Sequence, residues 1–261
     1  MRIALGLEYD GADFRGWQAQ EPGVRTVQGC LERALSQVAD HPVQVVCAGR
    51  TDAGVHASAQ IVHFDSDANR SVRSWVLGSN SNLPGDINVL WAHTVTDAFH
   101  ARFSAQARRY RYVIINRSAR SALYRRRATW CHTRLDVTRM QEAAQCLLGE
   151  HDFSSFRAQA CQAKSPVRTV YYLAVTRRCD WVVIDIEANA FLHHMVRNIA
   201  GVLMSIGIGE KPVCWAQEVL ELRNRALGGV TAPPDGLYLA AVRYAAAFGL
   251  PLTDDAMLLF A

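Results

Sequence analysis

Apolar and polar residues alternate along several short segments of the first hundred residues, which is the pattern of half-buried β-strands. The predicted strands cover residues 3–9, 43–48, 60–65 and 87–95. Apolar residues at helical spacing predict a helix over residues 27–38, after Thr26, and a second helix from Ser71 to about Ser79. Both Thr and Ser are residue types that cap helix N-termini. The resulting order, βαββαβ, is that of a ferredoxin-like domain.

The second half of the chain repeats this order with different residues. Strand patterns cover residues 108–115, 169–177, 181–188 and 237–244, and helical patterns cover 137–148 and 191–206, with a shorter one at 213–222. A repeated element order indicates an internal duplication, although residue identities do not repeat. We therefore predict an α+β fold of two ferredoxin-like halves with antiparallel sheets, residues 1–100 and 101–261, and a cleft between them.

Charge is distributed unevenly along the chain, although the net charge of +4 is modest. Of 28 basic residues only Lys164 and Lys211 are lysines, so 26 are arginines. Between Ala98 and Leu135 there is no Asp or Glu, and arginines occur at positions 102, 108, 109, 111, 117, 120, 125, 126, 127 and 134. A single-sign stretch this long indicates an anionic partner, and the planar guanidinium favours nucleic acid. We expect this stretch to bind RNA in a basic cleft.

Several classes of protein are disfavoured by composition. The seven cysteines are scattered without a Cys-x-x-Cys pair, and we expect no signal peptide, so reduced thiols in a cytoplasmic protein are predicted. The longest apolar run, residues 199–208, is short of the roughly 20 residues that a membrane span needs. Neither a GxGxxG nor a GxxxxGK[ST] motif occurs, and no His/Cys ligand spacing is present. We expect no nucleotide cofactor, no metal and no membrane association.

The connection between the strands at 43–48 and 60–65 contains the segment Gly49–His56, Gly-Arg-Thr-Asp-Ala-Gly-Val-His. A plain hairpin reversal needs only two to five residues, so this connection is long. Asp52 can bond its own backbone as a turn residue, or it can be a reacting carboxylate that a cation such as Arg50 keeps ionised. Spacing alone favours the turn. His56 is a weaker candidate, either for RNA contact or for bracing the loop.

Arginines alternate with aromatic residues in the strand at 108–115, as base-stacking and phosphate-binding surfaces require. Tyr110 and Tyr112 share a face, so spacing cannot choose which of them reaches the cleft and which lies in the core. Arg197, near the start of the helix at 191–206, can hold a carboxylate through its planar fork or can be an ordinary surface residue. His193 and His194 diverge as sequence neighbours and cannot chelate one metal well; we expect one to be buried.

A resemblance to a known family favours the functional interpretation of these residues. The segment Gly49–His56 resembles the active-site signature of the tRNA pseudouridine synthase A family. The resemblance extends over essentially the whole chain, through seven further motifs in the same order: Glu8–Gly11 with Gly16–Gln18, Asn82–Asp86, Phe99–Phe103, Arg109–Tyr112, Asp152–Phe156, His193–Asn198 and Gly236–Leu239.

The resemblance implies an isomerase that converts uridine to pseudouridine at positions 38, 39 and 40 in the anticodon stem and loop of tRNA. It implies Asp52 as the catalytic nucleophile, with Arg50 and Arg197 ordering the site. Tyr110 would stack on the target base, and Leu237, for which a core role is almost as good, would be an apolar wall. A homodimer is also implied, and no cofactor or metal is needed because substrate and product are isomers. The target nucleotide has to be flipped out of its helix.

Three chemical roles remain open for Asp52: attack on the sugar carbon, attack on the base, or removal of a proton from the ribose. Two other classes of protein also remain open from the residues alone. Two sheet domains with an arginine–aromatic strand could bind RNA without catalysis. A hydrolase could use Asp52 and His56. Only the isomerase changes uridine to pseudouridine without loss of base or strand.

Overall fold

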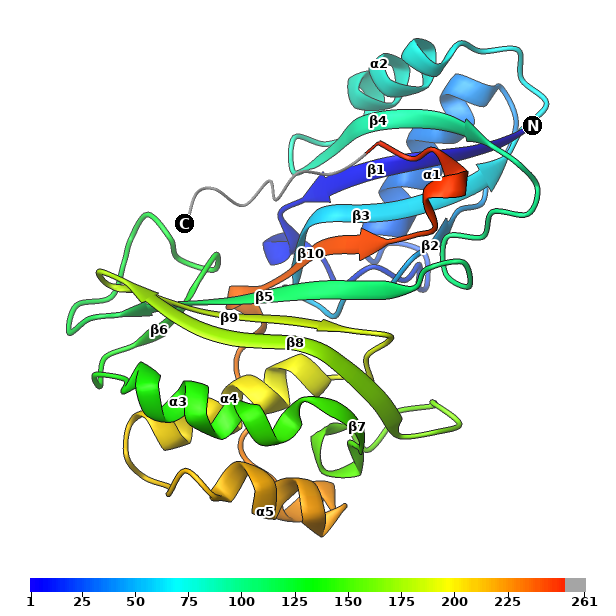
Figure 1. The fold of residues 1–261 in the computed structure, drawn as a ribbon. Coiled ribbons are helices and arrows are strands. Elements are labelled where there is room, and N and C mark those ends of the chain that lie inside the picture. Colours follow the sequence, from blue (N-terminus) through cyan, green and yellow to red (C-terminus); the bar gives the residue numbers. More distant parts are fainter. Residues whose placement is uncertain (252–261) are drawn as a thin grey trace. The chain divides into compact units, whose positions relative to one another are not determined.

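The structure, a computed structural model, describes residues 1–251, which contain ten β-strands and five α-helices (Figure 1). These residues divide into two compact units. The first unit comprises Met1–Gln106 together with residues 238–251, and the second comprises Ala107–Leu237. Each unit contains both strands and helices, as the alternation of strand and helix patterns predicts.

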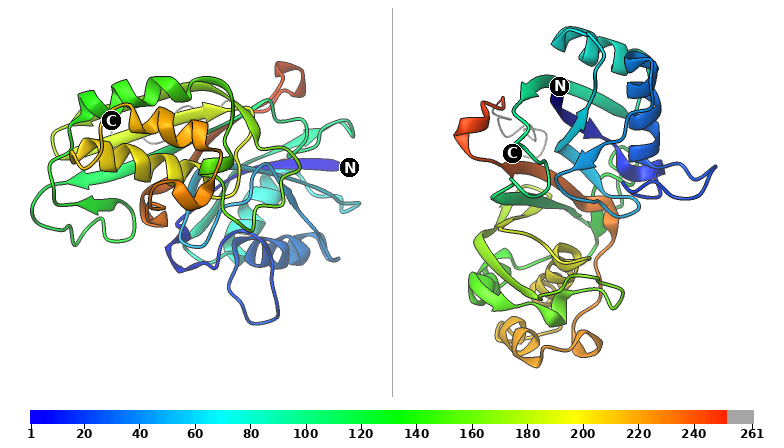
Figure 2. Two further views of the ribbon diagram at one scale, coloured as in Figure 1. Left: turned by 90° about the horizontal axis from the view of Figure 1, so that it is seen from below. Right: turned by 90° about the vertical axis from the view of Figure 1, so that its right-hand side faces the viewer.

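The strands of the first unit have the order β4-β1-β3-β10 within the sheet (Figure 1). Strand β1 (Arg2–Tyr9) runs antiparallel to both β4 (Ile87–Val95) and β3 (His56–Asp65). The last strand, β10 (Leu237–Arg243), runs parallel to β3 and places Tyr238 opposite His56. Helices α1 (Val27–Ala39) and α2 (Val72–Asn82) cover one face of this sheet (Figure 2). The parallel pairing of β10 departs from the antiparallel sheets that we predicted.

Both predicted helix caps of the first unit are confirmed. The Thr26 hydroxyl accepts a hydrogen bond from the backbone N–H of Gly29 at 3.3 Å, and the Ser71 hydroxyl accepts one from Ser74 at 3.1 Å. These bonds satisfy N–H groups that have no partner inside the helix. Helix α1 then buries the apolar face that its spacing predicts, with Leu31 and Leu35 fully inaccessible.

The strand predicted over residues 43–48 is much shorter in the structure, where β2 covers only Val46–Cys47. The preceding backbone is bonded to side chains of α1 rather than to a strand. The N–H of Val43 donates to the Ser36 hydroxyl at 2.9 Å, and that of Val45 donates to Glu32 Oε1 at 3.0 Å. Val43 and Val45 are still buried, so their apolar alternation is real but arises from packing beneath α1.

The strands of the second unit have the order β5-β9-β8-β7 within the sheet. Its strands β5 (Ala107–Asn116), β9 (Trp181–Ala188), β8 (Val167–Arg178) and β7 (Gly149–Asp152) are antiparallel to their neighbours, whereas β6 (Thr129–Cys131) is parallel to β5. Helices α3 (Val137–Ala144) and α4 (Met195–Gly207) pack on one face, and α5 (Trp215–Leu222) packs against both (Figure 1). No helix in the described part of the chain has the length and apolar character of a membrane span.

Helix α4 begins at Met195, four residues later than its apolar pattern predicts. His194 has a φ of 63°, a left-handed conformation that a right-handed helix cannot include. The preceding Leu192 is buried and its carbonyl accepts the N–H of Met195 at 3.0 Å. The apolar residues before His194 therefore belong to a turn that packs into the core, which helical periodicity does not distinguish from a first helical turn.

Candidate active site

The segment Gly49–His56 connects β2 to β3, whose first residue is His56, and is held against residues 10–17 in the first unit. The N–H of Trp17 donates to the carbonyl of Thr51 at 2.9 Å. Gly16 has a φ of 93°, and a Cβ there would lie 2.9 Å from the Thr51 carbonyl oxygen. A side chain at Gly16 would therefore push against the residue that precedes Asp52.

Hydrogen bonds from buried side chains fix the start of the same segment. The Gln60 side chain is fully inaccessible, and its Nε2 donates to the Gly49 carbonyl at 2.6 Å while its Oε1 accepts the Gly49 N–H at 3.4 Å. The hydroxyls of Tyr9 and Thr51 lie 2.8 Å apart, both buried. Sequence reasoning did not select Gln60 or Tyr9. A buried amide within an apolar strand was the available signal, because such a group needs a specific partner.

Asp52 is half-buried and Arg50 is exposed, so both side chains reach solvent from a loop whose backbone is fixed. The nearby Cys47 is a poor alternative nucleophile. Burial raises the pKa of its thiol to about 12, although the positive charges of Arg50 and Arg102 act in the opposite direction. Since the thiolate is the reactive form, the Asp52 carboxylate is a better candidate for a reacting group than the Cys47 thiol.

His56 ends the segment and lies in the core, with 1% of its surface exposed. Its Nδ1 is 3.0 Å from the backbone N of Gly11 and 3.1 Å from Oδ1 of Asp10. Its ring stacks on Tyr238, with centroids 4.6 Å apart. Of the two roles predicted for His56, these contacts favour bracing of the loop, and they leave the ring badly placed to act as the base of a hydrolase.

Tyr110, Arg197 and Leu237 all belong to the second unit, whereas Arg50 and Asp52 belong to the first. Tyr110 is 8% exposed, and its ring meets the edge of Phe191 with centroids 4.9 Å apart. Leu237 is 6% exposed. Both residues are therefore held mainly by packing, with a small part of each surface accessible.

Tyr112 is a core residue. It has no accessible surface, and its hydroxyl bonds to Thr129 Oγ1 at 2.6 Å and to the Pro233 carbonyl at 2.9 Å. Burial raises the pKa of this phenol well above its usual value. The sequence left Tyr110 and Tyr112 equivalent, and burial separates them: of the two, only Tyr110 retains accessible surface.

Arg197 lies in the first turn of α4, and its Nε donates to the Ala232 carbonyl at 2.8 Å. The Arg197 carbonyl in turn accepts the Ala232 N–H at 3.1 Å. This reciprocal pairing fixes the plane of the guanidinium. His193 is exposed and His194 is half-buried, so the expectation that one of them is buried is wrong. Their ring centroids lie 4.1 Å apart, so the expectation that the two side chains diverge is wrong as well.

Part of the arginine-rich stretch has a structural role. Arg109 and Arg111, on β5, both bind the carboxylate of Asp185 on the neighbouring strand β9, at 2.6 and 2.9 Å. Asp185 is only 8% exposed, and a buried carboxylate requires such partners. By contrast, Arg125, Arg126 and Arg127 are exposed in the connection between β5 and β6. Clustering along the chain alone could not separate these two groups.

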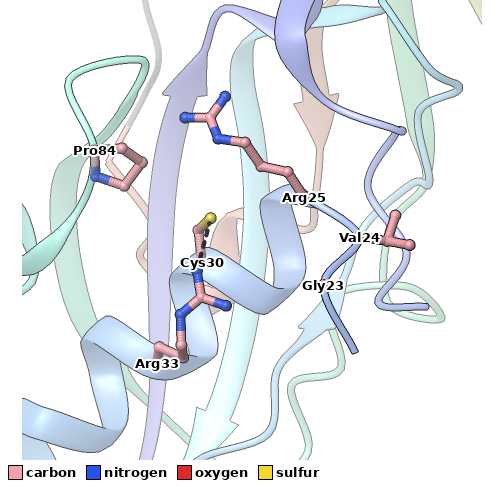
Figure 3. Close-up of a pocket in the computed structure, with 6 residues that line it drawn as sticks. All are labelled: Gly23, Val24, Arg25, Cys30, Arg33 and Pro84. Atoms are coloured by element: carbon pink, nitrogen blue, oxygen red, sulfur yellow. Dashed lines mark hydrogen bonds between the residues drawn. The ribbon is translucent and has the colours of Figure 1, made fainter. Parts of the chain in front are cut away.

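The first unit also has a shallow pocket of about 300 Å³, lined by Gly23, Val24, Arg25, Cys30, Arg33 and Pro84 (Figure 3). Arg25 forms a two-point ion pair with Asp86 at 2.8 Å, and Arg33 donates to the Cys30 sulfur at 3.2 Å. None of the predicted site residues lines this pocket. The carboxylate on the loop at Gly49–His56 therefore remains the best candidate for the reacting group.

Comparison with known proteins agrees with this site. The model of a family described as tRNA pseudouridine synthase matches residues 7–104 and 143–245. A tRNA pseudouridine synthase A from Nitrosococcus oceani is 66% identical over 251 residues, which cover 96% of each chain. Proteins of the same name from Alcanivorax borkumensis and Pseudomonas aeruginosa are each 60% identical over 96% of this chain, and the matches cover 94% and 88% of theirs.

A solved Cbf5-Nop10-Gar1 complex also matches, over 77% of this chain and 45% of the matched one. At 10% identity and a TM-score of 0.34, this likeness is too weak to bear on fold or function.

The matched residues include both loops that hold Asp52 and most of both units. The chain belongs to the tRNA pseudouridine synthase family, whose members are isomerases that convert uridine to pseudouridine in tRNA. The relatives described above are all named tRNA pseudouridine synthase A. The family and the isomerase activity that the sequence motifs imply are therefore confirmed.

Proposed function

We propose that this tRNA pseudouridine synthase modifies uridines 38, 39 and 40 in the anticodon stem and loop, with Asp52 as its reacting group. The observation that carries the proposal is a half-buried carboxylate on a loop whose neighbours are fixed by buried hydrogen bonds. Such preorganisation is what catalysis requires, because the reacting group has little freedom to lose in the transition state.

The reaction rearranges bonds within one nucleotide. The glycosidic C–N bond breaks, the base turns, a C–C bond forms to the same sugar carbon, and one proton moves from carbon to nitrogen. Atoms and electrons balance without an oxidant or a second substrate. Asp52 serves by attacking the sugar carbon or the base, or by taking a proton from the ribose. In each case the nucleotide has to leave its stack before Asp52 can reach it.

Four residues complete the proposed site. Tyr110, oriented by Phe191, stacks on the target base, and Leu237 forms an apolar wall beside it. Arg197, whose guanidinium plane is fixed by Ala232, and Arg50, from the same loop as Asp52, order the carboxylate and a neighbouring phosphate. A planar guanidinium suits both partners because its donors form a fork.

The finer architecture belongs to the same proposal. Two ferredoxin-like halves, residues 1–100 and 101–261, flank a basic cleft that receives the anticodon arm. The exposed arginines 125, 126 and 127 support the basic character of that cleft. Two copies form a homodimer that grips one tRNA at more than one place, and the enzyme acts in the cytoplasm.

Position mapping tests the substrate assignment. A tRNA transcript is incubated with the protein and treated with carbodiimide, and reverse-transcription stops are mapped. The proposal predicts stops at positions 38, 39 and 40 wherever these are uridine, and none in a transcript that carries cytidine there. Stops elsewhere would overturn the assignment of positions. A bound tRNA without stops would indicate a binding module, and loss of base or strand would indicate a hydrolase.

A further inference from the structure

Phe103 is one of the most exposed large apolar side chains of the described residues, with 75% of its surface accessible. It lies in the turn after β4, within the first unit. Isolated exposed apolar residues are common and need no explanation by themselves. Phe103 differs because the turn that presents it is fixed by several hydrogen bonds and because its ring is already packed on one side.

His100 organises this turn. Its Nδ1 accepts the backbone N–H groups of Arg102 and Phe103, each at 3.2 Å. The Ser104 hydroxyl accepts the N–H of His100 at 2.9 Å, and the Ser104 N–H donates to the His100 carbonyl at 2.8 Å. The His100 and Phe103 rings lie 4.4 Å apart, tilted by 30°. The phenyl ring is therefore oriented in advance, so little entropy is lost when a ligand covers it.

A buried histidine ties the turn to the sheet. His63, on β3, is 4% exposed; its ring centroid lies 4.8 Å from that of His100, and its Nδ1 accepts the N–H of Ala101 at 3.1 Å. Burial and the neighbouring His100 lower the pKa of His63 to about 4, so it remains a neutral acceptor near pH 7. His63 pairs with Val46 of β2, the strand that leads into the Asp52 loop. The turn thus has a rigid connection to the strands beside that loop.

Positive charge accompanies the exposed ring. The Arg102 guanidinium carbon lies 5.5 Å from the centroid of Phe103. The positive charges of Arg50 and Arg102 both act to lower the pKa of the Cys47 thiol, although burial raises it overall. An aromatic face with arginine beside it suits a nucleobase and its phosphate, because every base has a π-face and every linkage has a negative charge.

We propose that Phe103 and Arg102 form a second base-binding platform, on which an unpaired nucleobase of the tRNA, other than the reacting uridine, stacks while Arg102 contacts its phosphate. The platform rests on the proposed function in one respect, that tRNA is the substrate. A contact with a second copy of the chain is the main alternative. The polar neighbours of Phe103, namely His100, Arg102 and Ser104, favour RNA, because the core of a protein interface is depleted in charged residues.

Substitutions of Phe103 separate stacking from simple apolar contact. Phe103→Tyr keeps a flat ring, Phe103→Leu keeps apolar surface without a π-face, and Phe103→Ala removes both. Leu77→Ala, which truncates a 53% exposed residue on α2, is the matched control. Binding is measured with tRNA that the wild-type enzyme has already converted completely, so that no chemistry accompanies it and the result does not depend on which uridines react.

The platform predicts that Phe103→Leu and Phe103→Ala weaken tRNA binding by about 5- to 150-fold, the range for loss of one stacked base. Phe103→Tyr and Leu77→Ala are expected to bind as the wild type does, and all variants are expected to melt as the wild type does. Single-turnover rates at saturating enzyme are expected to change little, because the platform does not touch the reacting uridine.

Two results would overturn the platform. If Phe103→Leu binds tRNA as tightly as the wild type, no base stacks on the ring. If the mass of Phe103→Ala measured by sedimentation without tRNA is lower than that of the wild type, Phe103 mediates a contact between copies of the chain. Because isomerisation of unmodified tRNA is followed in a separate reaction, a wild-type protein that binds tRNA without converting it would refute the proposed function and leave the platform to be judged by binding alone.

Discussion

Gln60 offers the sharpest test of how the Asp52 loop is held. The substitution Gln60→Met keeps the length and approximate volume of the side chain but removes its bonds to the carbonyl and N–H of Gly49 and to the Tyr9 hydroxyl. The 2.6 Å bond to the Gly49 carbonyl is the shortest of the three. A polar group that loses its partner in a buried site costs about 1–3 kcal/mol.

The lower half of that range applies here, because Gly49 itself is only half-buried and water can replace part of the lost hydrogen bonding. We expect Gln60→Met to lower the free energy of unfolding by about 1–2 kcal/mol. The start of the loop also loses its anchor, three residues before Asp52. If misplacement of the Asp52 carboxylate raises the activation free energy by a similar amount, the single-turnover rate falls by about 5- to 30-fold.

The assay combines urea unfolding with single-turnover isomerisation at saturating enzyme. Gln44→Met, at an exposed position just before β2, controls for the introduction of methionine. Binding of tRNA is expected to be unchanged in both variants. The reasoning is refuted if Gln60→Met loses stability yet reacts at the wild-type rate, since Gln60 would then support the fold without positioning Asp52.

Three further predictions concern binding, the two tyrosines and acid stability. Reversal of Arg125, Arg126 and Arg127 to Glu should weaken tRNA binding and reduce its salt dependence, because fewer counterions are released; an unchanged salt slope would show that these arginines do not touch RNA. Tyr110→Ala should reduce kcat/KM at least about tenfold through loss of stacking, whereas Tyr110→Phe should retain activity. Tyr112→Phe should lower the melting temperature and leave activity per folded molecule unchanged, and the opposite pattern would reverse the two assignments. His63 has a pKa of about 4 in the folded state against 6.5 when unfolded, so unfolding takes up a proton and stability should fall by up to about 3 kcal/mol as pH drops from 6.5 to 4. His63→Gln should lack that part of the slope in urea unfolding at each pH, and a parallel slope in both proteins would rule His63 out.

Periodicity predicted most of the helices and strands because the buried faces of these elements are regular. It failed where apolar spacing came from other packing. Residues 43–45 alternate like a strand, yet their N–H groups bind side chains of α1. Phe191 and Leu192 extend the apolar pattern of α4 toward the N-terminus, yet the left-handed conformation of His194 prevents the helix from beginning before Met195. Local sequence does not specify which partner satisfies a backbone group.

The sequence identified Asp52 and its neighbours through the family motif, and spacing alone favoured an ordinary turn. Two kinds of structural information could not be obtained from the sequence. The distribution of charge along the chain could not show that Arg109 and Arg111 share Asp185, because that pairing depends on strand register. The roles of Gln60 and His100 depend on hydrogen bonds to backbone groups, which residue types alone do not determine.

The role of Asp52 is tested most directly by single-turnover isomerisation with Asp52→Asn and Asp52→Ala. Asp67→Asn, at an exposed carboxylate elsewhere in the first unit, is the control. Both Asp52 variants are expected to fold and to bind tRNA as the wild type does, yet to form no pseudouridine during the time in which the wild type and Asp67→Asn convert every target uridine. Measurable formation of pseudouridine by Asp52→Ala would contradict the assignment of Asp52 as the reacting group.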